Sequence, residues 1–267
     1  MDLSKIKMVV TDMDGTLLNS NHEVSKLFFS QFKKLQAKGI KFVAASGRQY
    51  HSMVSKLENI KDDITFIAEN GAVIKENDRE IDIIALDTSV TTHLLEIVSK
   101  IEGVHFMLCG AEISYFEEKS IALLKQLKEY YASYKIVSNF DTVKDDIVKI
   151  AIYHAISAEQ YIYPKLLHLN NQVKVKVSGQ NWVDINHIDV HKGNALLKVL
   201  AHHNISPNEV LVFGDYNNDI EMLSLSNYSF AMANAHPNVK KVAHYETTSN
   251  DAFGVETILE QLIASKS

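Results

Sequence analysis

A short acidic segment near the N-terminus has the composition of a catalytic loop. Asp12 and Asp14 lie two residues apart, and Gly15 follows Asp14. The segment comes shortly after the apolar residues Met8-Val9-Val10. Two carboxylates at this spacing can converge on one ligand, while the backbone N–H groups of a glycine turn can face an anion. On its own such a segment is as often an ordinary polar turn, so its meaning depends on the segments that lie beside it.

Three further polar segments are expected beside this loop. Ser46-Gly47 ends a second apolar strand, Lys192-Gly193 begins a helix, and residues 214–219 (GDYNND) end a later strand. If these strands are parallel neighbours, the four segments meet at one edge of the sheet, where such sheets bind ligands.

Together these residue types suit a magnesium-assisted reaction of a phosphate ester. The carboxylates of Asp12 and Asp215 and the backbone carbonyl of Asp14 would supply the oxygen ligands that Mg²⁺ prefers. A phosphate dianion also needs positive charge and hydrogen-bond donors. The candidates for that role are the Lys192 ammonium, the Ser46 hydroxyl, the Gly47 N–H and the Asn218 amide.

The metal ion and these donors would screen the repulsion between Asp12 and the phosphate dianion. Asp12 could then attack phosphorus and form an aspartyl-phosphate. Asp14 would protonate the departing alkoxide and then deprotonate the water that opens the acyl phosphate. Two other functions fit the same residues. A phosphomutase would return the phosphoryl group to a sugar hydroxyl, and a non-catalytic phosphate sensor would use Asp12 only as a phosphoacceptor, although a positioned base at Asp14 argues against a long-lived acyl phosphate.

The charge composition of the chain argues against some classes of binding partner. The 267 residues include 27 Lys and Arg against 33 Asp and Glu, giving a formal net charge of −6. This balance and the absence of a dense basic run argue against nucleic acid and against an anionic membrane surface. Cys109 is the only cysteine, so an intramolecular disulfide is impossible and a reducing, cytoplasmic location is expected. The chain has neither a signal-peptide pattern nor an apolar run of about 20 residues.

The pattern of predicted helices and strands divides the chain into two regions. Short apolar strands alternate with helices at both ends, which predicts a Rossmann-like α/β core with a parallel sheet over residues 1–85 and 188–267. Residues 86–187 instead mix helices with strands of period two and predict an inserted α+β cap domain. The expected strands are 7–11, 40–45, 65–68, 147–153, 172–177, 209–213 and 228–233; the expected helices are 24–38, 48–57, 92–101, 119–131, 158–169, 192–203, 236–242 and 254–264.

The motif series resembles that of the Cof-type branch of the haloacid dehalogenase superfamily. The matching segments are DMDGTLL at 12–18, ASGR at 45–48, ENGA at 69–72, Lys192-Gly193, GDYNND at 214–219 and AMANA at 231–235. The resemblance implies a magnesium-dependent phosphatase of small phosphorylated metabolites with a large cap inserted after the second motif.

The resemblance also implies individual roles. Asp12 would be the nucleophile and Asp14 the acid/base, and Asp12, Asp14 and Asp215 would hold Mg²⁺. The Met13 backbone would join Ser46, Gly47, Lys192 and Asn218 in contacting phosphate, and Asp219 would brace its loop or orient Lys192. The chain departs from the family where a Gly-Val-Ser/Asn run commonly precedes the lysine, because here Asp189-Val190-His191 does so.

Several other polar residues have simpler explanations. His187 and His191 have the helical spacing of zinc ligands but lack a third ligand in the sequence. His202-His203 falls at a helix end, where contact with the helix dipole is a sufficient explanation. Lys174 and Lys176 are expected on a solvated strand face, and Cys109 is expected to be a packed residue rather than a nucleophile.

Overall fold

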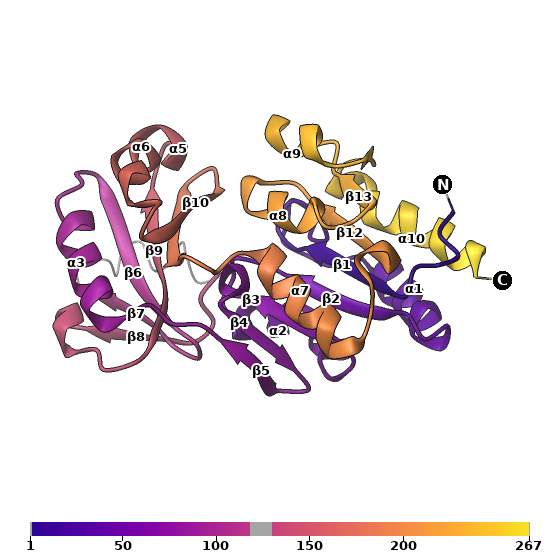
Figure 1. The fold of residues 1–267 in the computed structure, drawn as a ribbon, viewed down its shortest axis with the longest axis horizontal. Helices are drawn as coiled ribbons and strands as arrows, with labels where there is room; N and C mark the ends of the chain where they lie inside the picture. The colour runs from indigo at the N-terminus through magenta and orange to yellow at the C-terminus, as the bar shows by residue number, and fades with distance from the viewer. Residues whose placement is uncertain (1, 118–129, 267) are drawn as a thin grey trace.

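The computed structural model describes residues 2–117 and 130–266 and contains two sheets. The larger sheet has eight strands in the order β14-β13-β12-β1-β2-β3-β4-β5, and the smaller has six in the order β10-β11-β9-β6-β7-β8. Figure 1 shows the two sheets as separate lobes, with both ends of the chain at the far end of the eight-stranded lobe.

Both ends of the chain build the eight-stranded sheet. Its N-terminal elements are β1 (Met8–Asp12), α1 (Lys26–Ala37), β2 (Lys41–Ala45), α2 (Tyr50–Leu57), β3 (Thr65–Ala68), β4 (Val73–Glu76) and β5 (Arg79–Ile83). Its C-terminal elements are α7 (Lys192–His203), β12 (Val210–Gly214), α8 (Ile220–Leu223), β13 (Tyr228–Ala231), α9 (Pro237–Val242), β14 (Tyr245–Glu246) and α10 (Gly254–Ser265). The strands from β14 through β3 are parallel, and β4 and β5 add an antiparallel hairpin at the edge.

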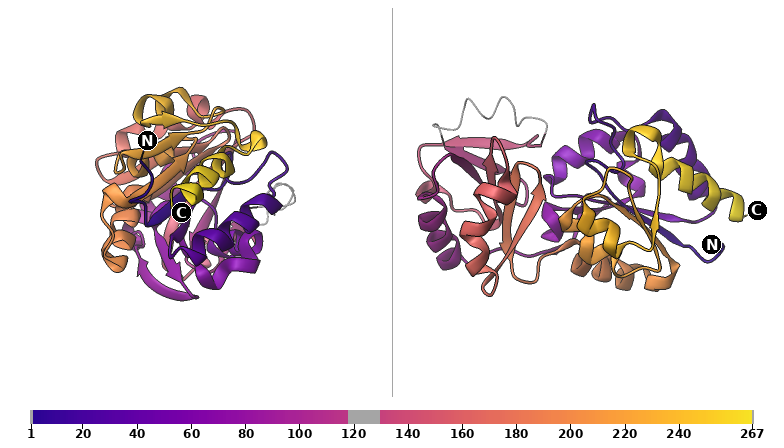
Figure 2. Two further views of the ribbon diagram at one scale, coloured as in Figure 1. Left: turned by 90° about the vertical axis from the view of Figure 1, so that its right-hand side faces the viewer. Right: turned by 90° about the horizontal axis from the view of Figure 1, so that it is seen from above.

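The central strands are buried on both faces, as a doubly wound sheet requires. All five residues of β1 and of β12 are buried. Helices α1 and α10 pack on each other, as do α7 and α8, and Figure 2 shows α1 and α7 on opposite sides of the sheet. The Rossmann-like fold class predicted from the sequence is confirmed.

The six-stranded sheet lies between β5 and α7 in the chain. Its elements are α3 (Thr88–Val98), β6 (Val104–Gly110), β7 (Ser114–Glu117), β8 (Tyr134–Val137), β9 (Ile147–His154), α5 (Ala158–Tyr161), α6 (Tyr163–Leu166), β10 (Val173–Gly179) and β11 (Trp182–His187). Its pairs are antiparallel except β7 with β8. Val173, Val175 and Val177 are buried whereas Lys174 and Lys176 are partly exposed, so the period of two is confirmed in β10.

Other predicted elements differ from those observed. The helix expected at 158–169 is broken into α5, α6 and a 3-10 turn, and the helix expected from residue 92 already begins at Thr88. The break coincides with Pro164, which has no N–H to continue the ladder from α5. The β4–β5 hairpin was missed, although Asn77 and Asp78 form its turn with φ of 51° and 59°. The helix expected at 119–131 falls almost entirely outside the described residues.

Helices in the described part of the chain are all too short or too polar to span a membrane.

Candidate active site

The predicted catalytic segments meet at the carboxyl ends of the parallel strands. Asp12 is the last residue of β1, and Asp215 follows β12, the strand that pairs with β1. Carboxylate oxygens of Asp12, Asp215 and Asp219 all lie within 4.8 Å of one another. This brings together groups that are more than 200 residues apart in the chain, as the sequence predicted for Asp12 and Asp215.

Lys192 is the cation of this acidic cluster. Its Nζ atom donates to Asp12 Oδ1 at 2.5 Å and to Asp219 Oδ1 at 2.6 Å, and its side chain is fully buried. Burial alone would lower the pKa of Lys192, but the Asp12 and Asp219 carboxylates outweigh it and raise that pKa. The ammonium is therefore charged throughout the physiological pH range.

The helix that carries Lys192 begins with an unusual cap. His191 is the N-cap of α7, and its Nδ1 accepts a hydrogen bond from the Asn194 N–H at 3.2 Å. A side-chain acceptor at this position satisfies one of the free N–H groups of the first turn. The departure from the family pattern at His191 thus preserves the capping interaction. Of the residues considered as a zinc pair, His191 is committed to this cap, and His187 lies 3.7 Å from Asp189 Oδ2.

Asp219 braces the loop after β12. Its Oδ2 atom accepts hydrogen bonds from the N–H groups of Asp215 at 2.9 Å and Tyr216 at 3.0 Å, while Oδ1 faces Lys192. Both oxygens are therefore used in holding the loop and the lysine. Asp215 is held from the other side, since Thr16 Oγ1 donates to its Oδ1 at 2.9 Å.

The acidic cluster has the chemistry of a site for a divalent cation. Burial and the neighbouring charges of Asp12 and Asp219 raise the pKa of Asp215 well above its usual value, and burial likewise raises the pKa of Asp12. One ammonium cannot offset three ionised carboxylates away from water, so a further cation is needed for all three to be ionised together. Oxygen donors with excess negative charge fit Mg²⁺, and Asp12 and Asp215 would hold it with their carboxylates.

Asp14 is held by an arginine that the sequence analysis did not single out. Arg48 Nε and Nη2 donate to the two carboxylate oxygens, each at 2.6 Å, and His22 Nδ1 lies 3.3 Å from Oδ1. Burial acts to raise the pKa of Asp14, but the hydrogen bonds from Arg48 and His22 outweigh it and hold the pKa well below its usual range. Asp14 is thus a carboxylate here and must leave Arg48 to act as an acid. The sequence signals for Arg48 were its place directly after Ser46-Gly47 at a strand end and its position in the ASGR segment at 45–48.

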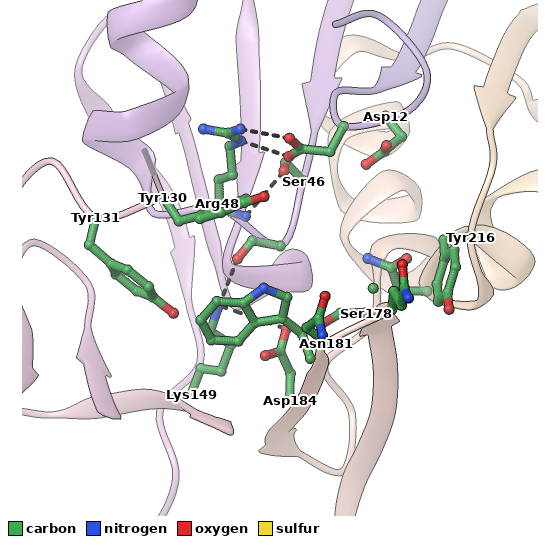
Figure 3. A pocket seen from close by; sticks show the side chains of 16 residues that line it. Asp12, Ser46, Arg48, Tyr130, Tyr131, Lys149, Ser178, Asn181, Asp184 and Tyr216 are labelled. Carbon is green, nitrogen blue, oxygen red and sulfur yellow. Dashed lines mark hydrogen bonds and ion pairs between the residues drawn. The ribbon is translucent and has the colours of Figure 1, made fainter. Parts of the chain in front are cut away.

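A pocket of about 240 Å³ opens beside Asp12 and Asp14. Figure 3 shows Asp12, Ser46 and Arg48 on one side and Lys149, Asn181 and Asp184 of the six-stranded sheet on the other. Aromatic rings form much of the wall, and several amide and hydroxyl groups accompany them. The aromatic residues are Tyr130, Tyr131, Trp182 and Tyr216, and the polar ones include Ser178, Gln180, Asn181 and Asn218.

The remaining predicted phosphate ligands lie along this pocket. Ser46, Gly47 and Asn218 line it, whereas Met13 is fully buried beneath the loop and its carbonyl accepts the N–H of Leu18. Asn218 Nδ2 donates to Asn70 Oδ1 at 3.1 Å. A Cβ atom at position 47 would lie 2.9 Å from the same oxygen, so only glycine fits this close approach.

A buried ionic cluster joins the two sheets under the pocket, and the sequence analysis missed it. Lys149 on β9 lies 2.5 Å from Glu69 Oε2 and donates to the Gly47 carbonyl at 2.6 Å. Asp184 on β11 is 3.8 Å from Lys149 and accepts a hydrogen bond from Asn70 at 2.5 Å. No periodicity marks these partners, because each belongs to a strand or turn distant in sequence; only the ENGA segment hinted at Glu69 and Asn70.

Tyr130 of the six-stranded lobe contacts both residues that hold Asp14. Its ring lies 4.6 Å from the Arg48 guanidinium carbon, and the centre of its ring lies 6.1 Å from that of His22. The second lobe therefore packs against the residues that hold Asp14.

Comparison with known proteins agrees with this geometry. A family model described as haloacid dehalogenase-like hydrolase matches residues 9–259. The chain belongs to the haloacid dehalogenase-like hydrolases. The resemblance seen in the sequence motifs is thereby confirmed, and the chain is an enzyme of the phosphatase class that carries out phosphoryl transfer.

Individual members of this hydrolase family align over almost the whole chain. The 5-amino-6-(5-phospho-D-ribitylamino)uracil phosphatase YbjI of Escherichia coli K12 is 31% identical over 97% of this chain and 96% of that protein. The crystal structure of SMU.1108c from Streptococcus mutans UA159 has a TM-score of 0.90 at 30% identity, covering 97% of this chain and 99% of that one. A haloacid dehalogenase-like hydrolase from Bacillus subtilis shares the fold, with a TM-score of 0.86 at 23% identity, covering 96% of this chain and 100% of that one.

Proposed function

We propose that this protein is a Mg²⁺-dependent phosphatase of small phosphorylated metabolites that works through an aspartyl-phosphate on Asp12. The observation that carries the proposal is the convergence of Asp12, Asp215 and Lys192 at one sheet edge beside a pocket. Mg²⁺ bound there would offset the charge of the substrate phosphate and of Asp12.

The side chains then have distinct tasks. An Asp12 oxygen attacks phosphorus, the ester P–O bond breaks, and the leaving oxygen takes a proton from Asp14, which gives the acyl phosphate and the free alcohol. Water then attacks the same phosphorus and passes a proton to Asp14, releasing inorganic phosphate and restoring Asp12. Lys192 orients Asp12 for the first step. Arg48 holds Asp14 as the carboxylate that it becomes once the leaving oxygen has taken its proton, and the proton later gained from water serves the next turnover.

Phosphate binding falls to groups that line the pocket or adjoin Asp12 directly. We propose the Gly47 N–H, the Ser46 hydroxyl, the Asn218 amide, the Lys192 ammonium and the Met13 backbone for this role. In the same scheme the carbonyl of Asp14 completes the protein ligands of Mg²⁺.

We further propose that residues 86–187 form a cap domain that selects the leaving group and that residues 1–85 and 188–267 form the catalytic core. The pocket wall supports this division, since Tyr131, Trp182 and Asn181 all come from the six-stranded sheet and its loops. Aromatic rings with adjacent amides suit a polyhydroxylated leaving group that bears a planar ring. The YbjI relative is named for a substrate of that kind. A reducing, cytoplasmic location accords with the single buried cysteine.

Phosphate release from a panel of metabolites, with and without Mg²⁺, tests the proposal. We expect hydrolysis that a chelator abolishes and Mg²⁺ restores, and a higher kcat/KM for a ribitylaminouracil phosphate than for ribitol phosphate. Asp12→Asn should fold normally and lose steady-state hydrolysis, while Asp62→Asn, an exposed carboxylate outside the pocket, should match the wild type. Unchanged activity of Asp12→Asn would refute the assigned nucleophile, and an isomerised sugar phosphate formed without free phosphate would indicate a phosphomutase.

A further inference from the structure

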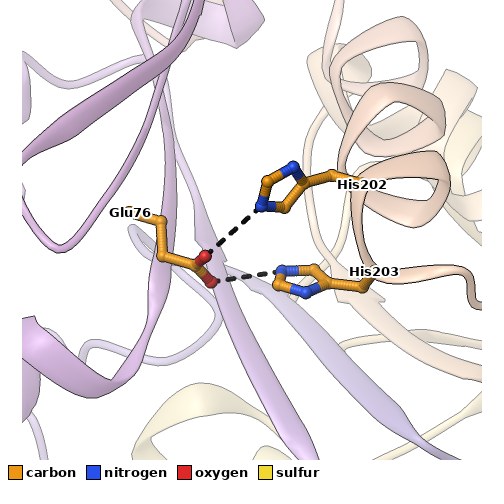
Figure 4. Close-up of side chains that lie close together, drawn as sticks. All are labelled: Glu76, His202 and His203. Atoms are coloured by element: carbon orange, nitrogen blue, oxygen red, sulfur yellow. Dashed lines mark ion pairs between the residues drawn. The ribbon is translucent and has the colours of Figure 1, made fainter.

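A second group of metal-ligating side chains lies at the opposite end of α7 from the catalytic lysine. Glu76 ends β4, and His202 and His203 are the last two residues of α7. Figure 4 shows both imidazoles pointing at the carboxylate of Glu76. Over the twelve residues of the helix, a rise of 1.5 Å per residue places this cluster about 16 Å along the axis from Lys192. It is therefore separate from the active site.

The three side chains present their ligand atoms to a common point. His203 Nε2 lies 3.1 Å from Glu76 Oε1, and His202 Nε2 lies 3.6 Å from Glu76 Oε2. One ligand atom from each residue lies within 4.8 Å of the other two. Ligand atoms about 2.0–2.2 Å from a tetrahedral ion are a little over 3 Å apart, so small rotations of the side chains suffice to close the site.

The surroundings hold the ligands in place. Thr65, which pairs with Glu76 across β3 and β4, donates its hydroxyl to Glu76 Oε1 at 2.8 Å. Such outer hydrogen bonds orient ligating carboxylates in known metal sites. The His203 side chain is only 8% exposed, whereas that of His202 is 47% exposed, so one face of the cluster is open to an entering ion.

The charge of the cluster suits a cation when the histidines are neutral. Burial lowers the pKa of His203, Glu76 acts to raise it, and Lys41 and His202 add to the lowering. A neutral imidazole offers a lone pair to a metal, and the carboxylate of Glu76 then leaves the three side chains with a net negative charge. The carbonyl end of the α7 dipole also favours a cation, while the charge of Lys41 opposes it.

We propose that Glu76, His202 and His203 bind a borderline-soft divalent cation, Zn²⁺ foremost, with water completing the coordination. Two imidazoles and one carboxylate form a typical three-ligand zinc set, whereas Mg²⁺ prefers oxygen donors alone. Among the described residues, the other cluster of this kind is the all-oxygen set of Asp12, Asp215 and Asp219. The two sites thus prefer different metal ions because their ligand atoms differ. Zinc at the second site links the end of α7 to the β3–β4 pair.

Zinc titration of the full chain tests the site directly. The protein is stripped of metal with a chelator and dialysed into excess Mg²⁺ to load the aspartate cluster. It is then titrated with Zn²⁺ by calorimetry. In a second titration Co²⁺ replaces Zn²⁺, because the visible absorption of Co²⁺ reports tetrahedral nitrogen coordination. We expect one equivalent of Zn²⁺ to bind and to raise the Tm. His202→Ala and His203→Gln should each weaken binding at least about tenfold, because a lost ligand costs more than a lost outer partner. His93→Ala, which removes an exposed imidazole on α3, should bind as the wild type does.

Three results would overturn the proposal. The first is no zinc binding by the wild type in excess Mg²⁺. The second is equal zinc affinity in the wild type, His202→Ala and His203→Gln, each shown to be folded by its unfolding transition in chelator. The third is binding that Asp12→Asn abolishes and His202→Ala retains, which would place the zinc at the aspartate cluster.

Discussion

Replacing Lys149 by Met is expected to destabilise the protein and loosen the loop that carries Gly47. The change removes the cation that lies 2.5 Å from Glu69 in a site where both side chains are buried. Removing one partner of a buried ion pair costs about 3–5 kcal/mol, because the other charge stays behind without compensation. The lost hydrogen bond to the Gly47 carbonyl adds about 1 kcal/mol. The free energy of unfolding should therefore fall by about 4–6 kcal/mol.

Urea unfolding of four variants measures this cost and its origin. Lys149→Met, Glu69→Gln and the double variant form a thermodynamic cycle, in which the double variant should recover at least about 2 kcal/mol relative to the sum of the single changes. Lys174→Met is the matched control. Lys174 pairs with Glu221 on the partly exposed face of β10, where removing the pair costs at most about 1 kcal/mol. Activity of Lys149→Met should show a raised KM, since Gly47 is proposed to contact phosphate.

The loss of stability in Lys149→Met should also depend on pH, in a direction set by the pKa of Glu69. Burial raises the pKa of Glu69 in the folded protein, and loss of Lys149 raises it further. A carboxyl group with a raised folded pKa contributes stability that is present at low pH and is lost as the pH rises through that pKa. The stability difference between Lys149→Met and the wild type should therefore be smaller at about pH 5 than at about pH 8. Additive effects of Lys149→Met and Glu69→Gln, with no change across this range, would refute the reasoning.

Two further variants examine the catalytic loop and the helix that carries the lysine. Asp14→Asn should lower kcat most for substrates with poor leaving groups, because these need the proton from Asp14; an equal loss for an aryl phosphate and an alkyl phosphate would contradict the donor role. His191→Ala should lower the free energy of unfolding by about 1 kcal/mol through the lost N-cap, while His191→Asn should restore most of it. Equal stability of His191→Ala and the wild type in urea would show that the cap contributes nothing.

The residues of the site that could be predicted from the sequence are those whose position follows from one short segment of the chain. The loop after β1 and the loop after β12 each place their carboxylates by following a buried strand, so Asp12 and Asp215 could be brought together before the structure was known. The strand β3 has the predicted bounds because all four of its residues, three of them apolar, are buried.

What escaped prediction depends on partners distant in sequence. The ionisation of Asp14 is decided by hydrogen bonds from Arg48, which lies 34 residues away in the chain, and from His22. Lys149 has no local signal, since its neighbours in β9 are also buried and its partner Glu69 lies in the turn after β3. His202 and His203 read as a simple helix end because Glu76, the residue they face, belongs to the hairpin that was missed.

The pairing of β1 with β12 has a consequence for biosynthesis. Val9 pairs with Leu211, so one edge of β1 stays without its neighbour until about 200 further residues have been made. Strands with an unpaired edge are prone to associate with other chains, and contacts this distant in sequence form slowly. We therefore expect the inserted lobe to fold on the ribosome before the central sheet is complete, with β1 shielded late in synthesis.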